Sequence, residues 1–147
     1  MTFLRGKSTS FTRFAVKAGT TIKDIDLAVS AHEFKGIPEG ELEAIGFCSY
    51  RNLLDASVDR GFLEGSKLWL TGLRRDVKKA PAALVRATVA RAMADLRTEY
   101  PNGVPKSLAK EVAAEEKRKL DLKAQARPAH AAVMLNADTR LGYVDGI

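Results

Sequence analysis

The stretch LWLTGLRRDVKKAPAALV, residues 68–85, constrains the fold more than any other part of this sequence. Residues 68–73 are rich enough in apolar side chains for a well-buried β-strand. Pro81 suits the first turn of a helix, where its missing N–H leaves no hydrogen bond unmade. Between the two elements stand four cations, Arg74, Arg75, Lys78 and Lys79. The pattern predicts a strand that leads into a helix, with positive charge concentrated at the junction.

The other periodic segments predict a mixture of strands and helices. Strands are expected at Phe11–Ala18, Ile45–Tyr50, Ala131–Leu135 and Leu141–Val144, with a turn at residues 64–66 before the strand at 68–73 and a turn or short helix at Asn52–Val58. Helices are expected from Thr20 or Thr21 to about Phe34, from Pro81 to Tyr100, and from Pro105 or Ser107 to Ala126. The fold class is therefore α+β, an antiparallel sheet of about five strands with two to three helices.

The two helices expected after Pro81 differ in kind. The first has one apolar stripe, formed by Val85, Val89, Ala92, Met93, Leu96 and Tyr100. The second carries charges on every side, and pairs such as Glu115 with Lys119 and Lys117 with Asp121 would stabilise it. A helix that is polar nearly all round indicates a long charged arm. We expect one domain over residues 1–147, with 81–127 as a helical, basic subdomain.

The positive charge of this chain lies in one segment. The net charge is +6, yet residues 67–127 hold fifteen Lys/Arg against seven Asp/Glu, while the segments before and after are each close to neutral. A localised basic region attracts polyanions, and nucleic acid is the commonest of these in a cytosol. A solvated basic face that only maintains solubility is the plainer alternative.

The spacing of the cations favours contacts with a phosphate backbone. Arg86 and Arg97 return to nearly the same angle on their helix, and Lys106, Lys110 and Lys117 align on the next. Few aromatic residues interleave with them, so neither a stacking platform nor a base-reading module is indicated. The expected DNA-binding residues are Arg74, Arg75, Lys78, Lys79, Arg86, Arg97, Lys106, Lys110, Lys117, Lys119, Lys123 and Arg127.

No catalytic constellation stands out. The two histidines, His32 and His130, have no metal-ligand spacing around them, and His32 is expected at the surface near a helix end. Cys48, the single cysteine, is expected to be a small buried residue. A metal-dependent nuclease built on Asp138 and Asp145 with Glu111 or Glu115 remains an alternative. We expect no enzyme activity, no cofactor and no metal.

The sequence also limits the compartment. A single cysteine allows no internal disulfide, no apolar run reaches the length of a membrane span, and the first residues lack the pattern of a signal peptide. We therefore expect a cytoplasmic protein without a membrane partner.

The order of these segments resembles the N-terminal half of the RdgC family, bacterial recombination-associated DNA-binding proteins. The resemblance begins at FTRFAVKAGTTIKDIDLAVSAHEF and continues through EAIGFCSY and LWLTGLRRDVKKAPAALV. SLAKEV and ARPAHAAVMLNADTRLGYVDG extend it over most of the chain. Residues 126–130, ARPAH, lack the leucines and phenylalanine that the family has there, and the chain ends where a family member would be about half complete.

The resemblance implies a DNA-binding function. Family members form a ring-shaped dimer around duplex DNA, bind without sequence preference and restrain RecA-driven recombination. A compact relative would suit a phage or a mobile element, and would associate with the nucleoid of its host cytoplasm. The resemblance thus predicts a protein that binds duplex DNA and modulates recombination or nuclease access, with a homodimer and a host recombination protein as further partners. The alternative is a phage-type module that inhibits a host enzyme by docking on it.

Overall fold

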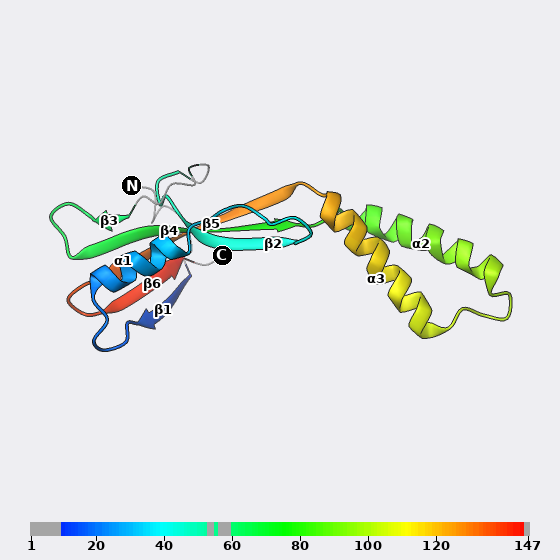
Figure 1. Cartoon of the computed structure of the whole chain (residues 1–147), viewed down its shortest axis with the longest axis horizontal. Coiled ribbons are helices and arrows are strands. Elements are labelled where there is room, and N and C mark those ends of the chain that lie inside the picture. Colours follow the sequence, from blue (N-terminus) through cyan, green and yellow to red (C-terminus); the bar gives the residue numbers. More distant parts are fainter. Residues whose placement is uncertain (1–9, 53–54, 56–59, 146–147) are drawn as a thin grey trace. The chain divides into compact units, whose positions relative to one another are not determined.

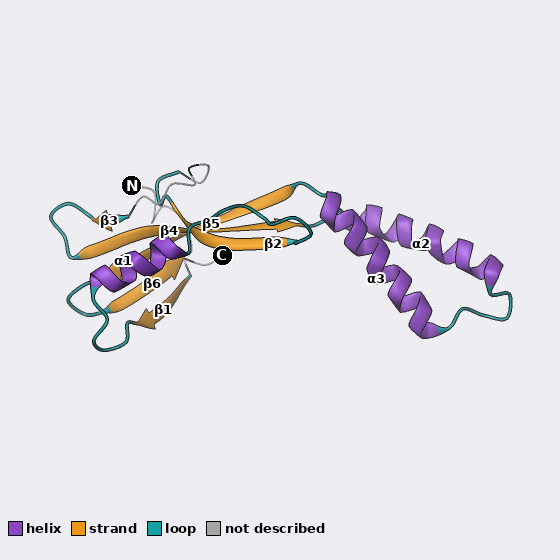
Figure 2. Cartoon of the chain, viewed as in Figure 1, coloured by secondary structure: helices purple, strands orange, loops and turns teal. Residues whose placement is uncertain are grey.

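The computed structural model describes residues 10–52, 55 and 60–145. In chain order its elements are β1 (Phe11–Ala15), α1 (Ile22–Ala31), β2 (Glu43–Cys48), β3 (Gly61–Phe62), β4 (Leu68–Lys78), α2 (Ala82–Glu99), α3 (Lys106–Lys123), β5 (Ala126–Asn136) and β6 (Leu141–Asp145). Figure 2 shows these strands and helices along the chain. The expected α+β class is confirmed, with three helices and one six-stranded sheet in the described part of the chain. The turn or short helix expected at Asn52–Val58 lies largely outside the described residues.

The chain divides into two compact units. The sheet unit takes residues 1–38, 44–76 and 128–147, and the helical unit takes residues 39–43 and 77–127. Strands β4 and β5 each pass from one unit into the other. The subdomain expected at 81–127 falls inside the helical unit, which also includes the short segment Glu39–Glu43.

The sheet has the strand order β1-β6-β5-β4-β2, and β3 also pairs with β4 (Figure 1). β1 is antiparallel to β6, with Phe14 opposite Gly142, and β6 is antiparallel to β5, with Val144 opposite Val133. The predicted closing hairpin is therefore confirmed. Its turn is held by Asn136, whose Oδ1 accepts the N–H groups of Asp138 and Thr139 at 3.0 Å each.

The core of the sheet unit lies between α1 and one face of the sheet. Val29 of α1 packs with Trp69 of β4 and Leu135 of β5, all at 3% exposure, and Ile25 and Phe47 pack against this cluster. Helix α1 begins where the sequence predicts. Thr21 accepts the N–H of Asp24, and the carboxylate of Asp24 accepts the N–H of Thr21, which together form a capping box.

A close backbone approach explains why residue 72 is a glycine. The carbonyl oxygen of Ser49 lies over β4, where it contacts Nε2 of His130 at 3.0 Å. A Cβ atom at Gly72 would come within 2.5 Å of that same oxygen. Only a residue without a side chain leaves the space for this contact. Cys48, next to Ser49, is fully buried as expected, and burial raises the pKa of its thiol.

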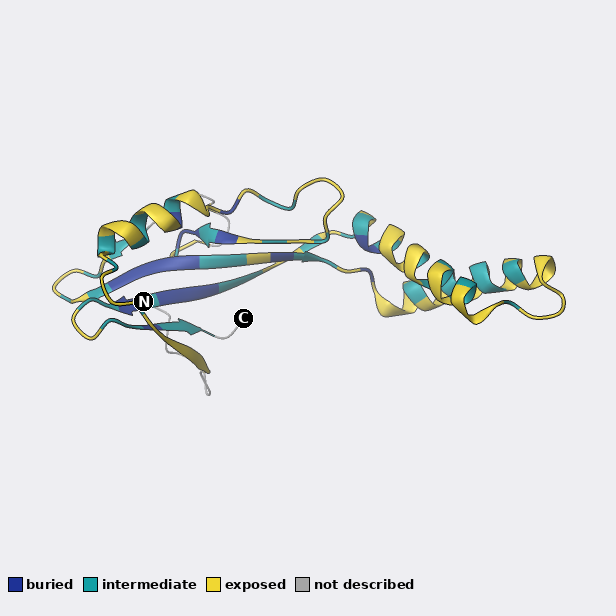
Figure 3. Ribbon diagram, turned by 60° about the horizontal axis from the view of Figure 1, so that its bottom comes forward, coloured by how far each residue is buried: buried dark blue, intermediate teal, exposed yellow. Residues whose placement is uncertain are grey.

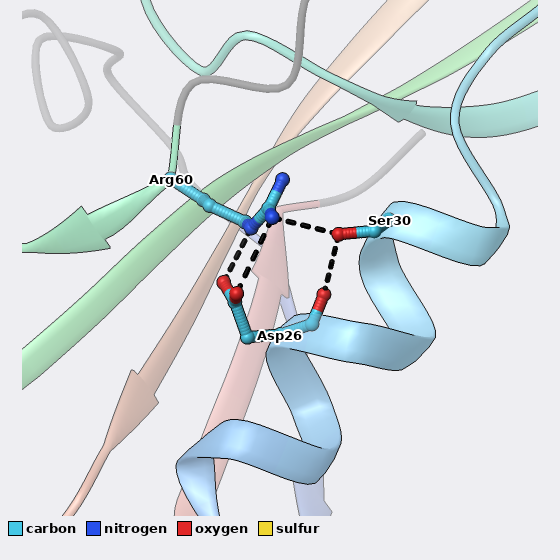
Figure 4. Close-up of polar contacts among 3 residues, drawn as sticks. All are labelled: Asp26, Ser30 and Arg60. Carbon is cyan, nitrogen blue, oxygen red and sulfur yellow. Dashed lines mark hydrogen bonds and ion pairs between the residues drawn. The ribbon is translucent and has the colours of Figure 1, made fainter.

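An arginine clamp ties α1 to the start of β3. The guanidinium of Arg60 pairs with the carboxylate of Asp26 and donates to Oγ of Ser30 at 2.7 Å (Figure 4). Ser30 in turn donates to the carbonyl of Asp26 at 2.9 Å. The ion pair with Asp26 raises the pKa of Arg60 above its ordinary value. This cation therefore serves the packing of the sheet unit.

β4 is longer than the sequence predicts. The expected strand ended at Leu73, whereas β4 continues to Lys78 and includes Arg74 and Arg75. Residues 74 and 76 point to the same side of a strand, and the pair that Arg74 forms with Asp76 lets charged residues continue in a buried strand. The cations at residues 74, 75 and 78 are therefore part of the strand rather than of a junction loop.

The helical unit is an antiparallel helical hairpin. The N–H of Ala80, just before α2, donates to Asp121 near the end of α3 at 2.8 Å. At the other end, Met93 and Tyr100 line a hollow together with Val104, which precedes α3, and Ala109, which lies in its first turn. No residue of α2 is fully buried, and on α3 only Asp121 is (Figure 3). The predicted α2 stripe is half-buried against α3 up to Leu96, but Tyr100 is 40% exposed.

Candidate nucleic-acid interface

The antiparallel hairpin brings two separate rows of cations onto one side. On α2, Arg86 and Arg97 are offset by roughly 90–110° from the centre of the half-buried stripe, at 100° per residue. On α3, the three lysines at 106, 110 and 117 are offset by roughly 80–120° in the same rotational sense. When two antiparallel helices pack side by side, residues that are offset by equal angles in the same rotational sense lie on the same side of the pair. These residues, Arg86, Arg97, Lys106, Lys110 and Lys117, form what we call the basic face.

The basic face is regular along the hairpin. The Ala80–Asp121 hydrogen bond sets the level of the two helices, so that Arg86 lies near the level of Lys117 and Arg97 near that of Lys106. Each row spans eleven positions, or about 16 Å at 1.5 Å per residue. Lys110 lies between the two ends. Roughly five phosphates of one DNA strand, spaced 3.4 Å along the axis, fit within this length.

The opposite side of the hairpin is acidic. By the same geometry Asp95, Glu99 and Glu115 lie there. The Nζ of Lys119 contacts Glu115 at 2.8 Å and Glu116 at 2.9 Å, and these carboxylates raise the pKa of Lys119. The predicted pair of Glu115 with Lys119 is confirmed. Lys119 therefore neutralises acidic residues on this side and lies outside the basic face.

Four of the five cations of the basic face have no acidic partner among the described residues. Arg86, Arg97, Lys106 and Lys110 are all exposed. Lys117 is 54% exposed and pairs with Oδ2 of Asp121 at 2.5 Å, as the sequence predicts. Lys79, Lys123 and Arg127 are also exposed, and Lys78 is half-buried at the end of β4. The helical unit thus presents most of the predicted DNA-binding cations to solvent.

Asp121 holds the last turn of α3 against the residue just before α2, at the base of the hairpin. It is 2% exposed, and its two oxygens accept from Lys117 and from the N–H of Ala80. The contact with Lys117, followed by that with Ala80, holds the pKa of Asp121 below its ordinary value of 3.8. Arg118 adds a hydrogen bond of 3.0 Å to the carbonyl of Gly40, within the same unit. These contacts fix the relation of α2 to α3, on which the basic face depends.

The structure commits Arg74 to a structural role. Its Nε and Nη2 donate to the carboxylate of Asp76 at 2.7 and 2.8 Å, and its guanidinium lies 4.4 Å from the centre of the Phe34 ring. The Arg74 side chain is 16% exposed, and Asp76 raises its pKa further. The sequence prediction grouped Arg74 with free surface cations because it placed the residue after the strand. Arg75, the neighbouring predicted residue, is exposed in the same strand.

The pairing of the two cation rows was not predicted from the sequence, although the signal was present. Each row was recognised separately, but neither was placed relative to the other. The short loop between two helices indicates antiparallel neighbours, and the half-buried positions then give the inward direction of each helix. Those two steps suffice to place all five cations on one side.

Other features of the structure carry no predicted site residue. A hollow of about 320 Å³ in the sheet unit is lined by Ile22, Ile25, Leu135 and Arg140, whose guanidinium donates to the carbonyls of Lys17 and Thr20. Across residues 10–52, 55 and 60–145, no three His, Cys, Asp or Glu side chains converge as a metal site would require. His32 is exposed, as expected. None of the helices within those residues is both long and apolar enough to cross a bilayer.

A comparison with models of known protein families finds no match, and no curated protein matches the sequence.

Proposed function

We propose that this protein binds DNA without sequence preference through the basic face of its helical hairpin. The proposal rests on one observation: the two rows of cations lie on one side of α2 and α3, and acidic residues lie on the other side. Cations at repeated intervals along a rod match a phosphate backbone, which offers charge but no sequence information. A solvated charged surface does not need this segregation, because mixed charges keep a protein soluble equally well.

We propose further that binding modulates recombination or the access of nucleases to DNA. The support is the resemblance to the RdgC family in the order of its segments, together with the helical position of the basic residues. A protein that occupies the backbone without reading bases would compete with any enzyme that tracks along the same duplex. On this proposal it acts in the cytoplasm, on nucleoid or phage DNA, and it needs no catalytic group of its own.

The test compares two triple variants of equal net charge. Arg86→Ala/Arg97→Ala/Lys110→Ala removes three cations from the basic face. Lys23→Ala/Lys35→Ala/Arg91→Ala removes three exposed cations from elsewhere. Fluorescence anisotropy with several unrelated duplexes at low salt measures the affinities. We expect the first variant to lose at least tenfold in affinity for every duplex and the control to change by less than threefold, since contact, rather than net charge, sets affinity.

Two outcomes would contradict the proposal. Equal losses in both variants would mean that only the overall charge matters. An absence of binding by the wild-type protein at low salt would remove DNA as the ligand and favour a protein partner for the hairpin.

A further inference from the structure

The end of the helical hairpin contains an open hollow that the basic face alone does not explain. It has a volume of about 520 Å³ and is lined by Met93, Arg97, Tyr100, Pro101, Gly103, Val104 and Ala109, all within the helical unit. We call it the tip hollow. Its volume lies within the range of pockets that take small organic groups. Most of its lining is apolar, with one guanidinium at the side.

The tip hollow lies on the same side of the hairpin as the basic face. Met93 is four positions before Arg97, so the two side chains are about 40° apart on α2. Arg97 belongs both to the basic face and to the lining of the hollow. A polyanion that follows the basic face toward the end of the hairpin therefore reaches the hollow directly.

Tyr100 gives the hollow an aromatic surface. The residue is 40% exposed. Hydrogen bonds hold the backbone from which the ring projects, because the N–H of Tyr100 donates to Leu96 and its carbonyl accepts from Gly103, both at 3.0 Å. An exposed aromatic ring beside a cation is the arrangement that stacks nucleic-acid bases. Helix α3 begins a few residues later at Lys106, and its N-cap residue, Pro105, makes no side-chain hydrogen bond to it, which favours an anion there.

From these features we propose that the tip hollow receives one unpaired base, stacked on Tyr100, while Arg97 contacts the adjoining phosphate. The inference rests on the proposed DNA binding and names the substrate class within it. The protein would bind duplex DNA in general but favour duplex that carries an unpaired nucleotide. Intact duplex keeps its bases stacked inside the helix, so the hollow stays empty on such DNA and contributes nothing to its binding.

The test compares one perfect duplex with the same duplex carrying a single unpaired 2-aminopurine. Base stacking on an aromatic side chain contributes about 1–3 kcal/mol, so the wild-type protein should bind the second duplex about 5- to 150-fold more tightly. Stacking should also quench the fluorescence of the 2-aminopurine. Tyr100→Leu keeps an apolar side chain but removes the ring, and should abolish both the preference and the quenching. Tyr100→Phe, the matched control, should keep both.

The design separates this inference from the proposed function. If Tyr100→Leu binds the perfect duplex with wild-type affinity and loses only the preference, both stand. Equal wild-type affinity for the two duplexes, or a preference that survives Tyr100→Leu, overturns the inference while leaving the binding of duplex intact. A wild-type protein that binds neither duplex overturns the proposed function as well. Thermal unfolding of each variant checks that the hairpin remains folded.

Discussion

Two arginines of the sheet unit and two of the helical unit have opposite surroundings. In the sheet unit, Arg60 pairs with Asp26 of α1, and Arg74 pairs with Asp76 of its own strand and lies over the ring of Phe34. In the helical unit, Arg86 and Arg97 are exposed and have no acidic partner among the described residues. An arginine side chain can thus stabilise the fold in one unit and be available to a ligand in the other. Burial and local partners, rather than residue type, decide which cations can bind a polyanion.

The two units also differ in how they are stabilised. The sheet unit has a core in which Val29, Trp69 and Leu135 are almost completely buried. The helical unit depends on half-buried apolar stripes and on the contacts of Asp121 at its base. A thin hairpin exposes more of its surface for a given length of chain. That exposure suits a binding surface, and it also means that fewer buried contacts stabilise the hairpin.

The largest expected effect comes from the same substitution made once in each unit. Arg74→Ala leaves the carboxylate of Asp76, at 5% exposure, without its cation, and breaking such a buried pair costs about 3–5 kcal/mol. Arg86→Ala removes an exposed side chain and should change the free energy of unfolding by less than about 0.5 kcal/mol. Urea unfolding followed by circular dichroism measures both. Similar values for the two variants would break the comparison between the units.

That contrast corrects an expectation from the sequence. From the sequence, Arg74 was placed with Arg75, Lys78 and Lys79 among the surface cations, whose removal would leave folding nearly unchanged. Because Arg74 pairs internally with Asp76, the fourfold variant would lose stability as well as charge. A variant meant to test DNA binding must therefore leave Arg74 in place.

A smaller effect is expected at the base of the helical hairpin. Asp121→Asn keeps an oxygen for the N–H of Ala80 but loses the charge that faces Lys117, which should cost about 1 kcal/mol at neutral pH. The folded-state pKa of Asp121 lies below 3.8, so its stabilisation is complete above that value and is lost as the pH falls through the lower folded value.

Hydrogen exchange of the α2 and α3 amides, measured from neutral pH down to about pH 3, would follow this contact. The difference between wild type and Asp121→Asn should be constant at neutral pH and shrink in the acid range. A difference that grows with falling pH would contradict the assignment of a charged Asp121 in the folded state.

The smallest effect is expected for the exposed pair on the acidic side. Lys119 contacts Glu115 and Glu116 in solvent, and exposed ion pairs on helices contribute little to the free energy of unfolding. Lys119→Ala should therefore be nearly silent in urea unfolding, and it should also leave DNA affinity almost unchanged because the residue lies outside the basic face. A tenfold loss of affinity in this variant would show that DNA contacts both sides of the hairpin.

Local patterns predicted most of the elements. The cap at Thr21, the helix after Pro81, the closing hairpin and both charged pairs on α3 follow from spacings of two to four residues, which the sequence displays directly. The extension of β4 to Lys78 was missed because three cations in five residues resemble a loop. The pair of Arg74 with Asp76 explains it, and their spacing of two residues on a strand was the available signal.

Such local patterns did not predict the contacts between residues that are distant in the sequence. Asp121 and Ala80 are 41 positions apart, and nothing in the sequence around Asp121 indicates that its carboxylate is buried. The approach of Ser49 to His130 over Gly72 joins three separate segments in the same way. The candidate site depends both on local patterns and on a contact between segments that are distant in the sequence. Its cations were predicted residue by residue, although Arg74 and Lys119 pair with acidic residues instead. Only the pairing of α2 with α3 shows which five cations share a side.

The salt dependence of duplex binding tests the central claim most directly. If the four cations of the basic face that have no acidic partner among the described residues each neutralise one phosphate, the logarithm of the association constant should fall with the logarithm of salt concentration with a slope of about −3.6. Arg86→Ala/Arg97→Ala/Lys110→Ala should reduce the magnitude of that slope by about 2.7, whereas Lys23→Ala/Lys35→Ala/Arg91→Ala should leave it unchanged. A slope that is the same in the wild-type protein and in the basic-face variant would contradict the claim that this side of the hairpin binds DNA.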